Sequence, residues 1–384
     1  MSIATEIERL KKAKNDLFRA VTAKGGVLDL SQKLDEYASG VDTIPSAVEG
    51  SGKYRVRFFD YDGTILKTVY TDGGEVTAPS VPEHERLLFQ EWNNDFDDIS
   101  SDLDVGAIYT TKSGMSEFDF DLNAQTGKSV TMRFRLLSGT LTLDWGDETI
   151  ETITTLGTAE YTHEYSSYGK YTVKVAGDWH NADGIVRSSN YCLVAAYFCN
   201  VPKLIAFFVN TAKSLKRLTF SADNYVSSWG YAMQGTNSLT HVNIPRGVVA
   251  TPLFMTNSGI RSISLPNTMT ALGQNSFQNC PALKEIILPQ SLTKIDAGLF
   301  ADANVGFSEI TIPVNVTEIG TLAFRARYSL SKVVMKPTTP PSLAADSFPA
   351  DGSLKEIIVP AGCGEDYKSA TNWSTFADII KEEE

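Results

Sequence analysis

Hydrophobic and polar residues alternate over short stretches in the second half of the chain, and a proline ends each stretch. In the stretch ALKEIILP, at 282–289, the residues Leu283, Ile286 and Leu288 are apolar, and two charged residues separate the first two. This alternation predicts a short strand with one buried face. Proline has no amide hydrogen to donate to a β-ladder, so Pro289 is predicted to end the strand.

The stretch recurs, so this half of the chain is a repeat. Prolines end equivalent stretches at intervals of 21, 23, 24, 24 and 23 residues: Pro245, Pro266, Pro289, Pro313, Pro337 and Pro360. A phenylalanine follows four of these prolines by 11 residues: Phe277, Phe300, Phe324 and Phe348. A period in the low twenties is typical of a leucine-rich solenoid, in which stacked units bury a face that no unit could bury alone.

The repeat resembles the BspA-like leucine-rich repeats of bacterial surface proteins. The stretch FQNCPALKEIILP, at 277–289, is close to that consensus, and EIGTLAF, at 318–324, matches its second half. The C-terminal stretch from Val359 resembles the end-cap of this family. The aromatic residues expected to close its last core layer are Tyr367, Trp373 and Phe376. The resemblance implies a mostly β solenoid over residues 190–384.

The repeat loses its register between Ala222 and Asn237. This segment places three aromatic residues among serines, asparagine and glycine: Tyr225, Trp229 and Tyr231. Aromatic faces among small polar residues suit sugar rings, and irregular insertions in solenoids usually map to a binding face. These rings are therefore candidates for ligand contact, while capping of the open first core layer by the same rings is the favoured interpretation.

Residues 1–48 are predicted to be helical, and a glycine pair at 25–26 would end the main helix. The apolar residues at helical spacing are Ile3, Ile7, Leu10, Leu17 and Val21. The spacing is close to a short heptad seam, which favours a homo-oligomer; packing against the next segment is the alternative. The stretch resembles N-terminal segments of bacteriophage tail and tail-fibre proteins, which implies attachment to other virion proteins.

Residues 52–111, the first β module, alternate apolar and polar positions, with turn signals at Asp62-Gly63 and Gly73-Gly74. The tripeptides DGT, at 62–64, and AIY, at 107–109, flank an A-P pair and a tryptophan. With these marks the module resembles the internalin-type B repeat, also called the Listeria–Bacteroides repeat. The resemblance implies a small β-grasp-like spacer.

The first β module also contains FFDYDGT, which resembles the first motif of haloacid dehalogenase phosphatases. In that family Asp60 and Asp62 would act as nucleophile and general acid. The chemistry needs a parallel sheet with crossover helices, whereas residues 64–146 show alternating strands without a long helical pattern. The sequence therefore favours a hairpin turn at Asp62-Gly63.

Residues 112–180, the second β module, are also predicted to form strands joined by turns. The distinctive motifs are W-G-D at 145–147, H-x-Y at 163–165 and G-x-Y-x-V at 169–173. They resemble the polycystic-kidney-disease (PKD) type of immunoglobulin-like β-sandwich. Carboxylates of Asp144, Asp147 and Glu148 could bind calcium, but aspartate side chains that hold a turn are the favoured interpretation. His163 is expected to be a hydrogen-bonded packing residue.

Composition narrows the possible partners. The chain has 384 residues, 42% of them hydrophobic, which is typical of a folded protein of about two to four domains. Its net charge of −12 disfavours a nucleic-acid partner. The four cysteines show neither metal-ligand nor C-x-x-C spacing, and Cys280 falls at a core position of the repeat. We therefore predict no disulfide framework, no metal site and no cofactor.

Common hydrolase motifs are absent from the sequence: there is no G-x-S-x-G elbow, no H-E-x-x-H and no P-loop. The four histidines fall in different segments, so acid–base chemistry would have to rest on carboxylates. A glycosidase with two carboxylates distant in the chain stays open on these grounds. No catalytic residue is predicted, and an enzyme is the third-ranked function.

The first 18 residues show no secretory signal, and the chain contains no run of about 18 apolar residues, so no membrane insertion is expected. The sequence therefore predicts a tail or fibre protein of a phage virion. Its N-terminal segment would dock or oligomerise, its β modules would act as spacers, and its solenoid would recognise a host cell-surface glycan or protein. The alternative is a BspA-like adhesin of the bacterial cell surface whose signal peptide is missing from this sequence.

Overall fold

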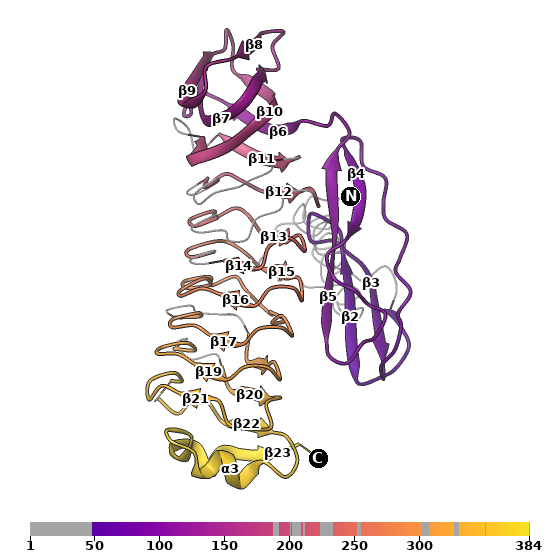
Figure 1. Ribbon diagram of the computed structural model, residues 1–384, viewed down its shortest axis with the longest axis vertical. Coiled ribbons are helices and arrows are strands. Elements are labelled where there is room, and N and C mark those ends of the chain that lie inside the picture. Colours follow the sequence, from indigo (N-terminus) through magenta and orange to yellow (C-terminus); the bar gives the residue numbers. More distant parts are fainter. Residues whose placement is uncertain are drawn as a thin grey trace, which may run out of the picture.

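A computed structural model describes most of the chain from residue 48 onward (Figure 1). The described residues are 48–186, 192–199, 201, 209, 212–222, 233–251, 255–301, 307–325, 330–349 and 351–383. Two expectations fall outside them: the N-terminal helix, and ligand contact or capping by Tyr225, Trp229 and Tyr231. In the described residues no helix is long and apolar enough to cross a membrane.

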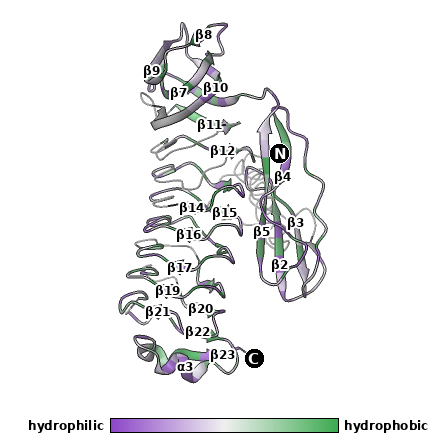
Figure 2. Cartoon of the chain, in the orientation of Figure 1, coloured by the Kyte–Doolittle hydropathy of each residue, from purple (hydrophilic) through white to green (hydrophobic). Residues whose placement is uncertain are grey.

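The first β module forms a five-stranded sheet in the order β1-β3-β2-β5-β4. Its strands are β1 (Val48–Glu49), β2 (Tyr54–Phe59), β3 (Ile65–Thr71), β4 (Leu87–Trp92) and β5 (Leu103–Thr111). The central pair, β2 and β5, is parallel, and its other neighbours β3 and β4 run antiparallel. Val56, Phe58 and Val105 are fully buried in the module's own core. Figure 2 shows the hydrophobic positions along β2 and β5.

A hairpin turn joins β2 directly to β3, as the sequence favoured. The Asp60 amide donates to the Thr64 carbonyl at 2.8 Å, and the Thr64 amide donates to Asp62 Oδ1 at 3.0 Å. Gly63 has a φ of +94°, which L side chains rarely adopt. This antiparallel connection leaves no place for the crossover helix that a phosphatase motif requires.

The second β module shares one sheet with the start of the solenoid. Its strands are β6 (Ser116–Leu122), β7 (Ser129–Asp144), β8 (Ile150–Ile153), β9 (Gly157–Glu164) and β10 (Gly169–Val186). β6 also pairs with β11 (Leu193–Phe198), which in turn pairs with β12 (Arg217–Phe220) in parallel. One hydrophobic core runs from Phe118 to Ile380. The expected boundary near 180–190 therefore lies within a continuous sheet and core, and this module covers the first solenoid layer.

The solenoid has two walls of short parallel strands (Figure 1). The first wall holds β13 (His241–Asn243), β15 (Ser262–Ser264), β18 (Glu309–Ile312), β20 (Lys332–Met335), β22 (Glu356–Val359) and β23 (Ile380–Glu382). The second wall holds β14 (Ala250–Thr251), β16 (Ala271–Leu272), β17 (Lys294–Ile295), β19 (Glu318–Ile319) and β21 (Ser342–Leu343). Residues 282–289 form no regular ladder, yet Leu283, Ile286 and Leu288 are buried as predicted.

Stacked phenylalanines fill the core between the walls. The ring centroids of Phe277 and Phe300 lie 5.6 Å apart, those of Phe300 and Phe324 lie 5.6 Å apart, and those of Phe324 and Phe348 lie 5.3 Å apart. All four rings are buried, because each unit repeats its predecessor's geometry. Cys280 is buried in the same core, as the repeat pattern predicted.

The C-terminal cap closes the last layer with α3 (Gly364–Ser369) and the 3-10 helix η2 (Trp373–Ile379). Trp373 Nε1 donates to the Pro341 carbonyl at 2.7 Å, and the Tyr367 hydroxyl donates to the Pro337 carbonyl at 2.7 Å. Phe376 packs edge-on against Phe348. The predicted cap is confirmed, since its buried polar atoms have partners on the preceding unit.

Candidate ligand-binding site on the solenoid

The first β module is not a spacer, because it lies against the first wall of the solenoid (Figure 1). Two neighbouring asparagines of this module reach across. Asn93 Nδ2 donates to the Ile244 carbonyl at 2.9 Å, and Asn94 Nδ2 donates to the Leu265 carbonyl at 2.9 Å. From the solenoid, Asn243 Nδ2 donates to the Ala107 carbonyl at 3.0 Å. These buried amides fix the position of the module on the wall.

Charged pairs extend the contact to the next unit. Arg57 Nε lies 2.7 Å from Asp104 Oδ1, and Arg57 Nη1 lies 2.6 Å from Glu285 Oε2. Arg55 binds the same Glu285 carboxylate. Burial favours a higher pKa for Glu285, but the charges of Arg57 and Arg55 outweigh it and hold the pKa below its usual range. No sequence pattern predicts this pairing, since Glu285 occupies an ordinary polar position of the strand pattern.

His241 lies at the centre of the contact and is fully buried. Asn243 Nδ2 donates to carbonyls, so Asn243 Oδ1 accepts from His241 Nε2 at 2.8 Å, and Ser262 Oγ donates to His241 Nδ1 at 2.7 Å. Burial lowers the pKa of His241 to about 4, so the ring is neutral at pH 7. The ring of Phe59 stacks on it with a centroid distance of 5.2 Å. This arrangement fastens two modules together and leaves no room for a substrate over the ring.

The other histidines whose side chains are described also form structural contacts. His84 Nε2 lies 2.9 Å from Asp60 Oδ2, and the Tyr109 hydroxyl donates to the same carboxylate. His163 Nε2 lies 2.7 Å from Asp147 Oδ2, and its ring stacks on Trp145, as expected of a packing residue.

The aspartates of the W-G-D motif hold a turn. The Gly146 amide donates to Asp144 Oδ1 at 3.0 Å, and the Thr149 amide donates to Asp147 Oδ1 at 3.2 Å. The favoured turn interpretation is therefore confirmed for Asp144 and Asp147. Across the described parts of the chain, no three His, Cys, Asp or Glu side chains gather in a way that could hold a metal ion.

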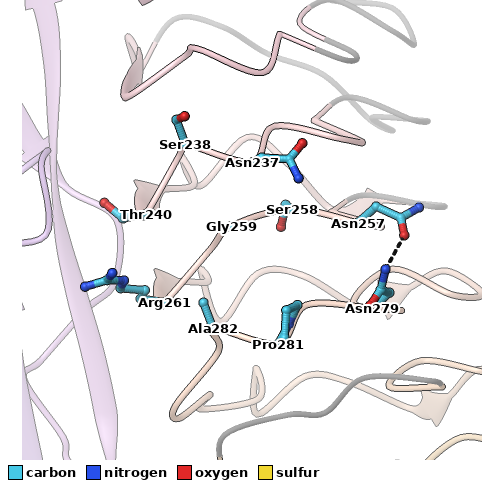
Figure 3. A pocket seen from close by; sticks show the side chains of 10 residues that line it. All are labelled: Asn237, Ser238, Thr240, Asn257, Ser258, Gly259, Arg261, Asn279, Pro281 and Ala282. Atoms are coloured by element: carbon cyan, nitrogen blue, oxygen red, sulfur yellow. Dashed lines mark hydrogen bonds between the residues drawn. The ribbon is translucent and has the colours of Figure 1, made fainter. Parts of the chain in front are cut away.

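A cavity of about 700 Å³ opens on the flank of the solenoid, where consecutive units turn toward the first wall (Figure 3). Asparagines recur along one end of it: Asn237, Asn257 and Asn279. Asn279 Nδ2 donates to Asn257 Oδ1 at 2.7 Å. Both residues have a positive φ, 59° for Asn257 and 53° for Asn279, a conformation that asparagine tolerates better than most residues.

The units approach closely at the floor of this cavity. A Cβ atom at Gly259 would lie only 1.9 Å from the Asn237 carbonyl oxygen, so the position requires glycine. At the other end of the cavity are Thr240 and Arg261, which point toward the first β module in Figure 3.

The lining chemistry favours binding over catalysis. Its described side chains are mainly amides and hydroxyls with one guanidinium, and they include no carboxylate and no histidine. Such groups donate and accept hydrogen bonds without offering a general base near neutral pH. The strand pattern of the sequence does not predict this cavity. The recurrence of asparagine at 237, 257 and 279 was the available signal, but it lies in turns rather than in the strand pattern.

Comparison with known families fits the solenoid geometry. Residues 205–302 and 249–372 match the BspA type leucine rich repeat region, in 6 copies. The solenoid is a BspA-type leucine-rich repeat region. The match covers the phenylalanine stack, the cavity and every wall strand except β23, and it confirms the predicted repeat family for this part of the chain.

Two solved structures of leucine-rich repeat proteins are similar to the chain. One is a leucine-rich repeat protein from Bacteroides ovatus, with 15% identity, a TM-score of 0.29, and coverage of 64% of this chain and 75% of that one. The other is a leucine rich cell surface protein from Faecalibacterium prausnitzii, with 16% identity and a TM-score of 0.30. That match covers 48% of this chain and 64% of that one, so it spans less than two thirds of the second protein. No curated protein matches the chain in sequence.

Proposed function

We propose that the protein is a non-enzymatic adhesin of the bacterial cell surface, whose BspA-type solenoid recognises a surface glycan or protein. One observation carries the proposal: the solenoid flank holds an open cavity lined by amide and hydroxyl groups and lacking acid–base residues. Sugars and peptides are bound through such groups, and solenoids bind partners along extended faces. The family match supports a bacterial surface protein, the alternative function in the sequence analysis, better than a virion protein.

The two N-terminal β modules take a different role in this proposal from the spacers expected at first. We infer that residues 52–111 are a β-grasp-like B repeat, which the parallel central pair β2 and β5 supports. Residues 112–180 are a PKD-like module, which the Asp147, His163 and Trp145 contacts support. The first module braces the flank beside the cavity, and the second covers the end of the core.

A phage tail or fibre protein is the second candidate. The resemblance of residues 1–48 to tail-protein N-termini favours it, together with the homo-oligomer and the virion contacts that this resemblance implies. Antibodies against the solenoid distinguish the two locations. Labelling of intact cells of the encoding bacterium supports the adhesin, whereas labelling confined to purified phage particles overturns it.

Binding is tested by coating beads with the full chain and measuring attachment to intact host cells. Attachment that competes with soluble chain supports recognition by this protein. If the purified chain releases reducing sugars from the same cells, the protein is a glycosidase, the enzyme class that the sequence left possible. Beads that attach no better than albumin-coated beads would refute the adhesin.

A further inference from the structure

One basic side chain lines the flank cavity, and a second follows it in the next unit. Arg261 lines the cavity immediately before β15, and Lys284 takes the equivalent place in the next unit. Backbone hydrogen bonds align them in a column: the Arg261 amide donates to the Thr240 carbonyl at 2.8 Å, and the Lys284 amide donates to the Arg261 carbonyl at 3.3 Å. We call Arg261 and Lys284 the basic rim.

Both charges of the basic rim lack a counter-charge. Arg261 and Lys284 are exposed, and in the part of the chain that the structure describes neither side chain makes a hydrogen bond or ion pair. Arg57 and Arg86, by contrast, are each held by two carboxylates. The guanidinium of Arg261 is therefore available to pair with an anionic ligand at the polar cavity.

The opposite end of the cavity supplies neutral polar groups. Asn279 and Asn257 bond each other through one amide hydrogen bond, which leaves Asn257 Nδ2 and Asn279 Oδ1 available. The Asn237 side chain makes no hydrogen bond within the described residues. The cavity therefore presents hydrogen-bond donors and acceptors at one end and the permanent positive charge of Arg261 at the other.

We propose that this cavity binds an acidic glycan, with a uronate carboxylate on Arg261 and ring hydroxyls on the asparagines. Arg261 can take the carboxylate through two parallel N–H bonds, and Lys284, one unit further, takes the carboxylate of the next sugar. The inference rests on the proposed function and names its ligand class. A nucleic acid fits less well, because the described lining holds no aromatic ring on which a base could stack.

Calorimetric titration of the full chain tests whether the cavity binds an acidic glycan. The probe is trigalacturonate, and the matched probe is its methyl ester, which keeps the sugar hydroxyls but loses the charges. We expect the acid to bind at least about tenfold more tightly than the ester, because charge-assisted hydrogen bonds are roughly twice as strong as neutral ones. Arg261→Gln should remove that preference and Arg261→Lys should restore part of it, since lysine keeps the charge without the planar fork.

Lys355→Gln is the control for Lys284→Gln. Lys355 holds the same place in a later unit, outside the cavity, where its amide donates to the Ser331 carbonyl at 2.8 Å. We expect Lys284→Gln to weaken the binding of trigalacturonate and Lys355→Gln to leave it unchanged. Equal affinity for acid and ester, no effect of Arg261→Gln, or preference for a single-stranded DNA oligomer would each overturn the acidic-glycan inference. If such a result were obtained while beads coated with the chain still attached to host cells, only the acidic-glycan inference would fail and the adhesin proposal would be kept.

Discussion

His241 is the residue whose charge state matters most for the contact between the first β module and the solenoid. It is buried between Phe59, Asn243 and Ser262, and each of its ring nitrogens is used in a hydrogen bond that fits the neutral ring. Protonation would force Nδ1 to become a donor while Arg57 adds repulsion and Asp62 adds attraction. The net environment disfavours the charged ring.

This predicts a loss of stability in mildly acidic solution. The pKa of His241 falls from 6.5 in the unfolded chain to about 4 in the folded chain, so the unfolded chain binds more protons between these values. The contribution of neutral His241 to the free energy of unfolding is therefore fully present above pH 6.5. That free energy falls by about 3 kcal/mol as the pH drops to 4. Urea unfolding of wild type and His241→Gln across this window measures the effect. Identical pH slopes for the two proteins would contradict it.

At the scale of elements, the phenylalanine stack ties each solenoid unit to the next. Phe300 contacts Phe277 on one side and Phe324 on the other, and all three are buried. A unit has little core of its own, so stability is shared between neighbours. Damage to one ring should therefore spread to adjacent layers.

Phe300→Ala is predicted to lower the free energy of unfolding by about 3–5 kcal/mol, because it leaves a cavity between two rings that cannot close in. Val314→Ala serves as the control, since Val314 is 52% exposed and should cost less than about 0.5 kcal/mol. Thermal melts and chemical denaturation measure both. A Phe300→Ala melt that matches the control would show that the stack does not stabilise the solenoid.

The repeat elements could be predicted because their signal is local. Prolines such as Pro289 and rings such as Phe300 recur at a fixed period, and burial follows the alternation even where the ladder at 282–289 is irregular. The docking of the first β module could not be predicted, since Arg57 and Glu285 lie 228 residues apart. Each occupies an ordinary polar position of an alternating strand pattern, which does not indicate a partner. The flank cavity was missed for a similar reason, because turn residues from separate units build it.

At the scale of the whole molecule, the three β parts form a single body rather than a string of spacers. The second module shares the solenoid's core, and the first is fastened along its flank by buried amides and by the Arg57 ion pairs. The first module therefore lies beside the flank on which the cavity opens.

Removing Arg57 is predicted to loosen this assembly. Arg57→Ala leaves the buried Asp104 carboxylate without its bidentate partner, which typically costs about 3–5 kcal/mol. The control is Lys332→Ala, which removes an exposed pair with Glu309 and should cost less than about 1 kcal/mol. Amide hydrogen exchange in β13 and β15 should rise only in Arg57→Ala. Unchanged protection there would mean that the ion pairs do not hold the module.

The most direct test of the account is to fill the flank cavity and measure attachment. Asn237→Trp places a large ring in the cavity from an exposed position, so the fold should be kept. Thr270→Trp, also exposed but outside the cavity lining, is the matched control. Bead attachment to host cells should be lost with Asn237→Trp and kept with Thr270→Trp, while both melt like wild type. Full attachment by a folded Asn237→Trp protein would contradict recognition through this cavity.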